Sequence, residues 1–285
     1  MPKHKFKILC NTFTFLENDN KGYSTWAKES KHIEWVHEGH GSGGQQETFD
    51  SLTSEDETFY VDRYLPIAFQ DTKSKKKYGM ILECGWLNAE IINDVKSRLD
   101  EYMNCYDMIF TWSEELCDLH DRIKWIPGMG SWIKEPQIYP KSKLVSMIAS
   151  NKSWLPGHQQ RLHMIEQLKD YVPLFGRGFQ EVELKEEALA DYMFSVAIEN
   201  KDDWFTEKLL DCFLTGTVPI FWGTPNLGKW FNMDGVIILE DGFDIESLTE
   251  EMYHERKDAI KDNFERALKM EQIEDYIWEN YFEIR

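Results

Sequence analysis

The sequence predicts an α/β protein with two domains, each built around a parallel sheet, and with a cleft between them. Along the 285-residue chain, short apolar runs of strand length alternate with segments of helical periodicity. Strands separated by helices favour parallel pairing, with helices on both faces of the sheet. A stretch rich in proline and glycine, residues 127–143, divides this pattern into two halves. We interpret that stretch as the inter-domain linker.

In the first half, a helix is expected from the cap Asn88 to about Tyr102, because apolar residues recur there at helical spacing. A shorter helix is expected to begin at Ser113. Residues 39–58, rich in glycine, serine and acidic residues, predict a loop, the segment expected to be most mobile. The strands expected in this half are Phe6–Cys10, Tyr78–Leu82, Asp107–Thr111 and Ile123–Ile126.

In the second half the alternation is clearer, and it ends in residues 245–284, which predict two long acidic helices. Two further helices are expected at Gly157–Tyr171 and Glu207–Thr215. The strands expected in this half are Leu144–Ala149, Val172–Phe175, Phe194–Ile198, Val218–Trp222 and Gly235–Leu239.

The charge balance argues against a polyanionic partner. With a net charge of −19, the chain is expected to bind neither nucleic acid nor an anionic membrane surface. Residues 141–180 are the exception, because six basic residues stand there against Glu166 and Asp170. A small anionic ligand would fit this local excess of positive charge.

Five widely spaced cysteines, with no CxxC pair, indicate neither a disulfide framework nor a zinc site. The N-terminal apolar run is short enough to be a strand rather than a signal peptide, and no stretch is long enough to span a bilayer. We therefore expect a soluble, cytoplasmic protein.

Residues 194–228 concentrate polar groups between a strand and a helix. Thr206 is a good N-cap for that helix and Gly216 a good C-cap. In open α/β sheets ligands bind at this edge, and a helix N-terminus favours phosphate. Lys208 stands in the first turn, where acidic residues are usually preferred, so it suggests a nearby anion. The alternative is an exposed lysine paired with Asp211 or Asp203.

Three ordered motifs in residues 144–230 resemble the donor-binding signature of glycosyltransferase family ten, the alpha-1,3/4-fucosyltransferases. They are EN…WFTEKLLDCFLTGTVPIFWG, the upstream LVSMIASNKSWLPGHQQRL and, between them, LFGRG. The resemblance implies two Rossmann-like domains of the GT-B type. It also implies a GDP-fucose donor or another GDP-sugar, a glycan acceptor, and inversion at the anomeric carbon without a metal or other cofactor.

By this resemblance, Arg161 and Lys208 hold the diphosphate, Asn200 and Trp204 contact the donor, and Glu207 binds a ribose or fucose hydroxyl. The full set of donor-binding residues implied is Ser150, Asn151, Arg161, Gly176, Arg177, Glu199, Asn200, Trp204, Thr206, Glu207 and Lys208. The domains expected are an acceptor-side domain, 1–140, and a nucleotide-sugar domain, 141–265. The C-terminal helix, 266–285, is expected to pack back on the first domain.

The chain departs from the family pattern in three places. The loop between Asn200 and Thr206 is short, and Trp204 stands where the family usually has tyrosine. The membrane anchor and lumenal disulfides of Golgi members are not seen, which favours a soluble form of bacterial or viral type. The absence of an Asp-x-Asp motif, by contrast, agrees with the metal-independent transfer that the resemblance implies. Asp202-Asp203 is more consistent with a solvated turn than with a metal site.

An inverting transferase needs a carboxylate that accepts the proton of the acceptor. This base is expected from the first domain, across the cleft from the donor. Glu83 follows a predicted strand and precedes a tight turn, Cys84-Gly85-Trp86, that would place an indole at the cleft. Glu38, between two histidines, is the alternative. Transfer from another GDP-sugar, and carbohydrate binding without catalysis, remain competing functions.

Overall fold

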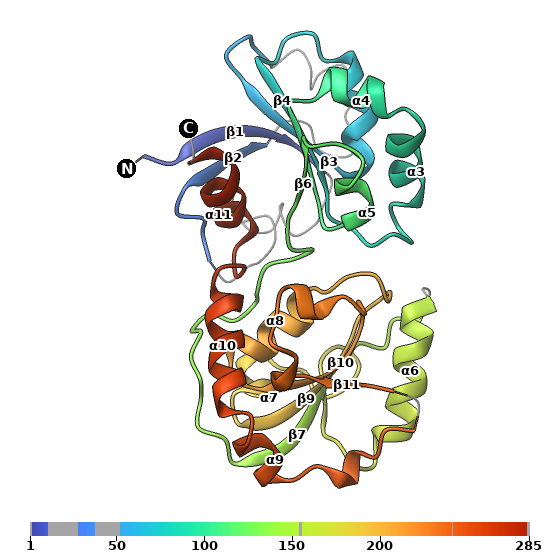
Figure 1. Cartoon of the computed structure of the whole chain (residues 1–285), viewed down its shortest axis with the longest axis vertical. Helices are drawn as coiled ribbons and strands as arrows, with labels where there is room; N and C mark the ends of the chain where they lie inside the picture. Colours follow the sequence, from blue (N-terminus) through green and yellow to red (C-terminus); the bar gives the residue numbers. More distant parts are fainter. Residues whose placement is uncertain (1, 11–27, 38–51, 154–155, 241, 284–285) are drawn as a thin grey trace. The chain divides into compact units, whose positions relative to one another are not determined.

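The protein is an α/β protein with parallel sheets, as the sequence predicts. The computed structural model describes residues 2–10, 28–37, 52–153, 156–240 and 242–283. The chain divides into two compact units, Met1–Met129 with Gln272–Arg285, and Gly130–Glu271. Each unit holds one sheet, and every recorded strand pair in both sheets is parallel (Figure 1).

The first unit contains a six-stranded sheet in the order β2-β1-β3-β4-β5-β6. Its strands are β1 (His4–Leu9), β2 (Ile33–His37), β3 (Glu57–Val61), β4 (Lys76–Ile81), β5 (Met108–Thr111) and β6 (Ile123–Trp125). The sequence pattern missed β2 and β3. The start of β3 falls inside the loop expected at 39–58. This strand gives no apolar-polar alternation in sequence, because four of its five residues are buried. The rest of that loop, apart from residues 52–56, lies outside the described residues.

Two apolar layers cover the faces of this sheet. On one face Phe6 and Ile8 pack with Ile273 and Ile277 from the end of the chain, and on the other Tyr60 packs with residues of the helices after β4. Figure 1 shows α11 on one side of the sheet and α3 and α4 on the other. The helices of this unit are η1 (Asp62–Gln70), α3 (Ala89–Ser97), α4 (Leu99–Cys105), α5 (Glu114–Cys117), α11 (Ile273–Ile277) and a π-helical turn (Trp278–Phe282).

The single helix expected from Asn88 to Tyr102 is two helices, interrupted at Arg98. Asn88 precedes α3 but its side chain makes no capping hydrogen bond. Its amide instead donates to the carboxylate of Asp62, 2.6 Å away. Sequence spacing could not reveal this partner, which lies 26 residues earlier in the chain. Ser113, by contrast, caps α5 as expected.

The prediction of two long helices over residues 245–284 is wrong. The segment is broken into η4 (Ile245–Ser247), α9 (Glu250–His254), α10 (Lys257–Leu268), α11 and the π-helical turn. Extended backbone at Gln272 separates α10 from α11. After Gln272, two buried acidic residues accept hydrogen bonds from side chains of the first unit. Trp35 Nε1 donates to Glu274 at 3.2 Å, and Ser30 Oγ donates to Asp275 at 2.5 Å.

The second unit contains a five-stranded sheet in the order β11-β10-β9-β7-β8. All seven residues of its central strand, β9, are buried, as expected for a parallel strand covered on both faces. Its strands are β7 (Lys143–Ile148), β8 (Leu174–Phe175), β9 (Tyr192–Ile198), β10 (Val218–Trp222) and β11 (Ile237–Ile238). Its other helices are α6 (Pro156–Leu168), α7 (Glu186–Leu189), α8 (Glu207–Leu214), η2 (Leu227–Lys229) and η3 (Met233–Gly235).

Much of the predicted linker belongs to the second unit. Residues 130–143 lie within it, whereas the sequence pattern placed the domain boundary after residue 140. The physical reason is long-range hydrogen bonding. The Oγ of Ser131 and the N–H of Trp132 both donate to Asp211 on α8, at 2.7 and 2.9 Å. In the described part of the chain, no helix has both the length and the apolar character needed to cross a bilayer.

Candidate functional site

The carboxyl edge of the second sheet gathers most of the predicted donor-binding residues. Because β7, β8 and β9 are parallel, their carboxyl ends meet at one edge. Ser150 and Asn151 follow β7, Gly176 and Arg177 follow β8, and Glu199 and Asn200 follow β9.

Two of the three motifs meet in backbone hydrogen bonds at this edge. The N–H of Asn151 donates to the carbonyl of Arg177 at 3.1 Å. Gly176 has a φ of 104°, and a Cβ there would lie 2.3 Å from the carbonyl oxygen of Ala149. A side chain at this position would therefore push the two loops apart. Asn151 and Arg177 are both exposed, so their side chains are accessible at this edge.

Arg161 is a buried cation whose hydrogen-bond partners are neutral side chains. Its side chain comes from α6, and the residue is 4% exposed. Its terminal nitrogens donate to Ser150 Oγ at 3.2 Å and to Asn200 Oδ1 at 3.4 Å. Its Nε is buried and has no hydrogen-bond partner among the described residues. Burial lowers the pKa of this guanidinium. The charges of Glu199 and Glu207 oppose that shift, but among the described residues neither carboxylate is hydrogen-bonded to Arg161. A buried cation without a directly bonded anion suits an incoming one.

Lys208 is paired with a fully buried carboxylate. Its Nζ lies 2.8 Å from Glu199 Oε2 and 3.0 Å from Thr206 Oγ1. The backbone N–H and hydroxyl of Thr206 also donate to Glu199, at 2.7 and 2.8 Å. Glu199 therefore holds both Lys208 and the N-terminus of α8, where Thr206 is the N-cap. The alternatives from the sequence, Asp211 and Asp203, are not its partners.

The charges of this group shift one another's pKa values. Burial raises the pKa of Glu199, and the positive charge of Lys208 opposes that shift. Burial alone would lower the pKa of Lys208, but the carboxylates of Glu199 and Glu207 raise it overall. Burial would likewise raise the pKa of Glu207, yet the charges of Lys208 and Lys185 lower it to about 2. Lys208 is therefore a cation, and Glu207 an anion, throughout the physiological range.

His158 is a member of this group that the sequence motifs did not indicate. It lies in the first turn of α6 and is 3% exposed. Burial and the charges of Arg161, Lys152 and Lys208 lower its pKa to about 4. The imidazole is thus neutral at pH 7 among three cations. A lone histidine carries no such signal in sequence, because its neighbours come from separate loops.

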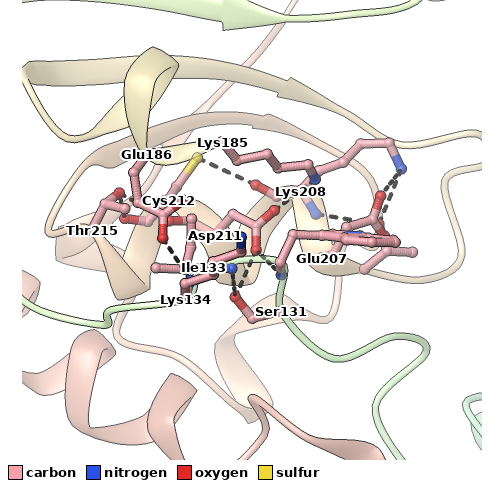
Figure 2. A network of polar contacts seen from close by, with 12 residues as sticks. Ser131, Ile133, Lys134, Lys185, Glu186, Glu207, Lys208, Asp211, Cys212 and Thr215 are labelled. Atoms are coloured by element: carbon pink, nitrogen blue, oxygen red, sulfur yellow. Dashed lines mark hydrogen bonds and ion pairs between the residues drawn. The ribbon is translucent and has the colours of Figure 1, made fainter. Parts of the chain in front are cut away.

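The polar network continues along α8 to Asp211 (Figure 2). Asp211, 1% exposed, binds Lys185 Nζ at 2.6 Å besides Ser131 and Trp132. Burial raises the pKa of this carboxyl, and the charge of Lys185 opposes the shift. The network fixes the helix that carries Glu207 and Lys208 to the segment entering the second unit.

Two predictions from the sequence remain: Trp204 as a donor contact, and Asp202-Asp203 as a turn rather than a metal site. Trp204 is 6% exposed, and its carbonyl accepts the N–H of Thr224 at 3.1 Å. Asp203 forms an ion pair with Lys201. In the part of the chain that the structure describes, no group of three or more acidic, histidine or cysteine side chains is placed to hold a metal ion.

A pocket of 310 Å³ lies at the carboxyl ends of the strands of the second sheet. Two of its walls are formed by α6, the helix that carries Arg161, and by the end of β9, the strand that Glu199 follows. Trp222 and Leu239 line it from the neighbouring strand ends, and the carboxylate residue Glu240 lies at its border. The lining residues are Gln160, Met164, Ile198, Trp222, Leu239 and Glu240.

In the first unit, Glu83 is exposed two residues after the end of β4. The turn that follows it is the one expected from the sequence, because the N–H of Leu87 donates to the carbonyl of Cys84 at 2.9 Å. Trp86, in that turn, is 52% exposed. Glu38, the alternative base, lies outside the described residues.

The fold and this edge place the protein in the GT-B class of glycosyltransferase folds. A solved structure described as "Crystal Structure of alpha1,3-Fucosyltransferase" has the same fold, with a TM-score of 0.50 and 17% sequence identity. The match covers 92% of this chain and 82% of that one. The family model "Glycosyltransferase family 10 (fucosyltransferase) C-term" matches residues 138–280. The chain therefore belongs to glycosyltransferase family 10, as the motifs predict.

Two curated relatives agree with this family. The protein is 30% identical over 201 residues to the "Alpha-(1,3)-fucosyltransferase FucT" of Helicobacter pylori, a match covering 68% of this chain and 38% of the relative. It is 32% identical over 85 residues to the "GDP-fucose protein O-fucosyltransferase 3" of Rattus norvegicus, covering 28% of this chain and 16% of the relative. The chain thus spans well under half the length of these relatives.

Proposed function

We propose that this protein transfers fucose from GDP-fucose to a hydroxyl of a glycan acceptor, with inversion at the anomeric carbon and without a metal ion. One observation carries the proposal. Arg161 is buried beside Lys208 at the carboxyl edge of the second sheet, and the oxygens that accept its hydrogen bonds belong to neutral side chains. A diphosphate would supply the hydrogen-bonded anion that Arg161 does not find in Ser150 and Asn200. The family and the names of the two relatives support fucose as the sugar.

The proposed reaction places the two cations at the leaving group. As the acceptor oxygen bonds to the anomeric carbon, the bond from that carbon to the β-phosphate oxygen breaks, and its electron pair leaves with GDP. Arg161 offers a fork of donors and Lys208 a point charge to the phosphate oxygens. Fixed cations stabilise the developing charge best where water is excluded. They provide the charge that a divalent ion provides in metal-dependent transferases.

We assign the proton acceptor to Glu83, with Glu38 as the alternative. The acceptor hydroxyl gives its proton to this carboxylate while the new glycosidic bond forms. The nucleoside is assigned to the pocket beside α6. Trp222 offers an aromatic surface there, and Glu240 a carboxylate that can accept the N–H groups of a guanine edge.

The test is a transfer and donor-hydrolysis screen against a glycan array, run in excess EDTA with GDP-fucose and with GDP-mannose. Fucosyl transfer with inverted anomeric configuration is the expected result. Transfer from GDP-mannose but not from GDP-fucose would show that mannose, not fucose, is the sugar transferred. Thermal stabilisation by GDP without any turnover would favour a non-catalytic carbohydrate-binding protein, and activity that EDTA abolishes and manganese restores would refute metal independence.

A further inference from the structure

Asp62 has an unusual backbone conformation at the carboxyl end of β3. Its φ is 51°, the one positive value among the non-glycine residues that the structure describes. This left-handed region is disfavoured for residues with a Cβ, although aspartate tolerates it better than most. Asp62 is also 8% exposed, which is rare for a carboxylate without a cation. Such a conformation persists only where surrounding contacts impose it.

Those contacts all come from the turn that follows β4. One carboxylate oxygen, Oδ1, accepts the N–H of Leu82 at 2.8 Å, the N–H of Glu83 at 3.3 Å and the side-chain amide of Asn88 at 2.6 Å. The carbonyl of Glu83 in turn accepts Trp112 Nε1 at 3.2 Å and the amide of Asn88 at 3.4 Å. Both backbone polar groups of Glu83 are therefore held.

The turn itself is closed by backbone hydrogen bonds. The N–H groups of Leu87 and Asn88 donate to the carbonyl of Cys84, at 2.9 and 3.0 Å, and Cys84 is fully buried. Glu83 thus presents an exposed side chain from a backbone that is fixed on both sides. Its carboxylate can be reoriented only by rotation of its own side chain.

We propose that Asp62 is a positioning residue for glycosyl transfer, which holds the Leu82–Asn88 turn so that the Glu83 carboxylate is directed at the acceptor hydroxyl. The inference rests on the proposed function, in which Glu83 takes the acceptor's proton. Asp62 touches no reacting atom in this scheme. It acts by fixing where the base stands, and a displacement of about 1 Å at a reacting group can lower a rate by about 10²-fold.

Asp62→Gly removes the acceptor oxygen while glycine still adopts a positive φ without strain. Asp62→Asn keeps an oxygen acceptor of the same size and tests rescue. Asp71→Gly is the matched control, since Asp71 is 3% exposed in the same unit. Asp71 likewise accepts three donors, from Tyr60, Lys73 and Ser74, at 2.7, 2.8 and 3.1 Å. None of them belongs to the turn that carries Glu83.

We expect Asp62→Gly to lower kcat by about 10–100-fold, while the acceptor KM and the affinity for GDP change by less than about 2-fold. Asp62→Asn should retain kcat within about 5-fold, and the Asp71→Gly control should retain it within about 2-fold per folded molecule. In a Glu83→Gln background, Asp62→Gly should slow transfer no further, because a positioning residue acts only through the group that it positions.

Three results separate the ways in which the inference can fail. Wild-type kcat in Asp62→Gly, with Glu83→Gln inactive, would overturn the positioning role and leave the proposed function intact. Normal turnover of Glu83→Gln would overturn the base assignment and this inference with it, and absence of transfer by the wild type would overturn the proposed function. If Asp62→Gly does not fold, Asn88→Ala removes the donor shared by Asp62 and the Glu83 carbonyl, and it must lower kcat without changing the acceptor KM.

Discussion

Replacing Lys208 by methionine should destabilise the protein as well as weaken donor binding. Methionine keeps most of the apolar stem but removes the ammonium that lies 2.8 Å from Glu199, a carboxylate with no exposed surface. Losing one partner of a buried ion pair typically costs about 3–5 kcal/mol. In the variant, Glu199 can take up a proton and become neutral, so the loss of stability cannot exceed the cost of protonating it. For a carboxyl of ordinary pKa 4.5, protonation at pH 7 costs about 3.4 kcal/mol, at about 1.4 kcal/mol per pH unit. We therefore expect a loss near 3 kcal/mol.

The pH dependence of this loss identifies its cause. Without Lys208, burial holds the pKa of Glu199 well above its unfolded value, so the folded variant binds more protons than the unfolded chain between pH 4.5 and 7. Its stability falls as the pH rises through this window. Lys208 lowers the pKa of Glu199 in the wild type, so the difference from wild type should shrink as the pH falls below 7. Urea denaturation at several pH values measures it.

Two variants control for the charge change. Lys169→Met removes an exposed lysine just after the end of α6 that pairs with Glu166 at 2.5 Å, and should leave the stability almost unchanged. The double variant Glu199→Gln/Lys208→Met should recover most of the stability but not GDP binding. If Lys208→Met unfolds within about 0.5 kcal/mol of wild type at pH 7, the ion pair does not hold the N-terminus of α8 and the reasoning fails.

Four further changes probe other parts of the molecule. Arg161→Met should weaken GDP binding by about 1.5–3 kcal/mol in calorimetry. Its Tm should be unchanged or higher, because burial of the guanidinium is relieved and its hydrogen-bond partners, Ser150 and Asn200, are neutral; a Tm loss like that of Lys208→Met would contradict this. His158→Gln should make the stability of the protein depend less on pH between pH 6.5 and 4. In this window the unfolded wild-type chain binds a proton that the folded imidazole, with a pKa of about 4, does not, and urea denaturation with an unaltered pH slope would refute it. Lys141→Met should destabilise the protein by at least about 2 kcal/mol in urea, since its Nζ donates to the carbonyls of Leu189, Ala190 and Thr215. Glu83→Gln should lower transfer by about 10²–10⁴-fold while the Kd for GDP hardly changes, and near-normal turnover would move the base to Glu38.

Local sequence signals were sufficient for the α/β class and for most elements of the second unit. β10 runs over the residues predicted for it, and Thr206 caps α8 as expected. These features depend on apolar periodicity and capping chemistry within about 15 residues, which a single sequence displays. The motifs around Asn151 and Arg177 also proved to be neighbours in space.

What the sequence could not show depends on long-range partners. Asn88 is a good cap by residue type, but its amide is taken by Asp62. The ion pair of Lys208 with Glu199 joins a helix to the end of a strand, and no spacing rule distinguishes Glu199 from Asp211 or Asp203 as its partner. The break between α10 and α11 follows from buried contacts of Glu274, which helical periodicity does not record.

The most direct test of the central claim is a calorimetric titration of GDP and of guanosine into the wild type and Arg161→Met, in excess EDTA. If Arg161 and Lys208 form the diphosphate site, the wild type binds GDP at least about 10²-fold more tightly than guanosine. Arg161→Met should lose most of that difference while its affinity for guanosine stays the same. Equal affinity of the wild type for GDP and guanosine, or an undiminished preference for GDP in Arg161→Met, would contradict the assignment of this buried cation group to the diphosphate.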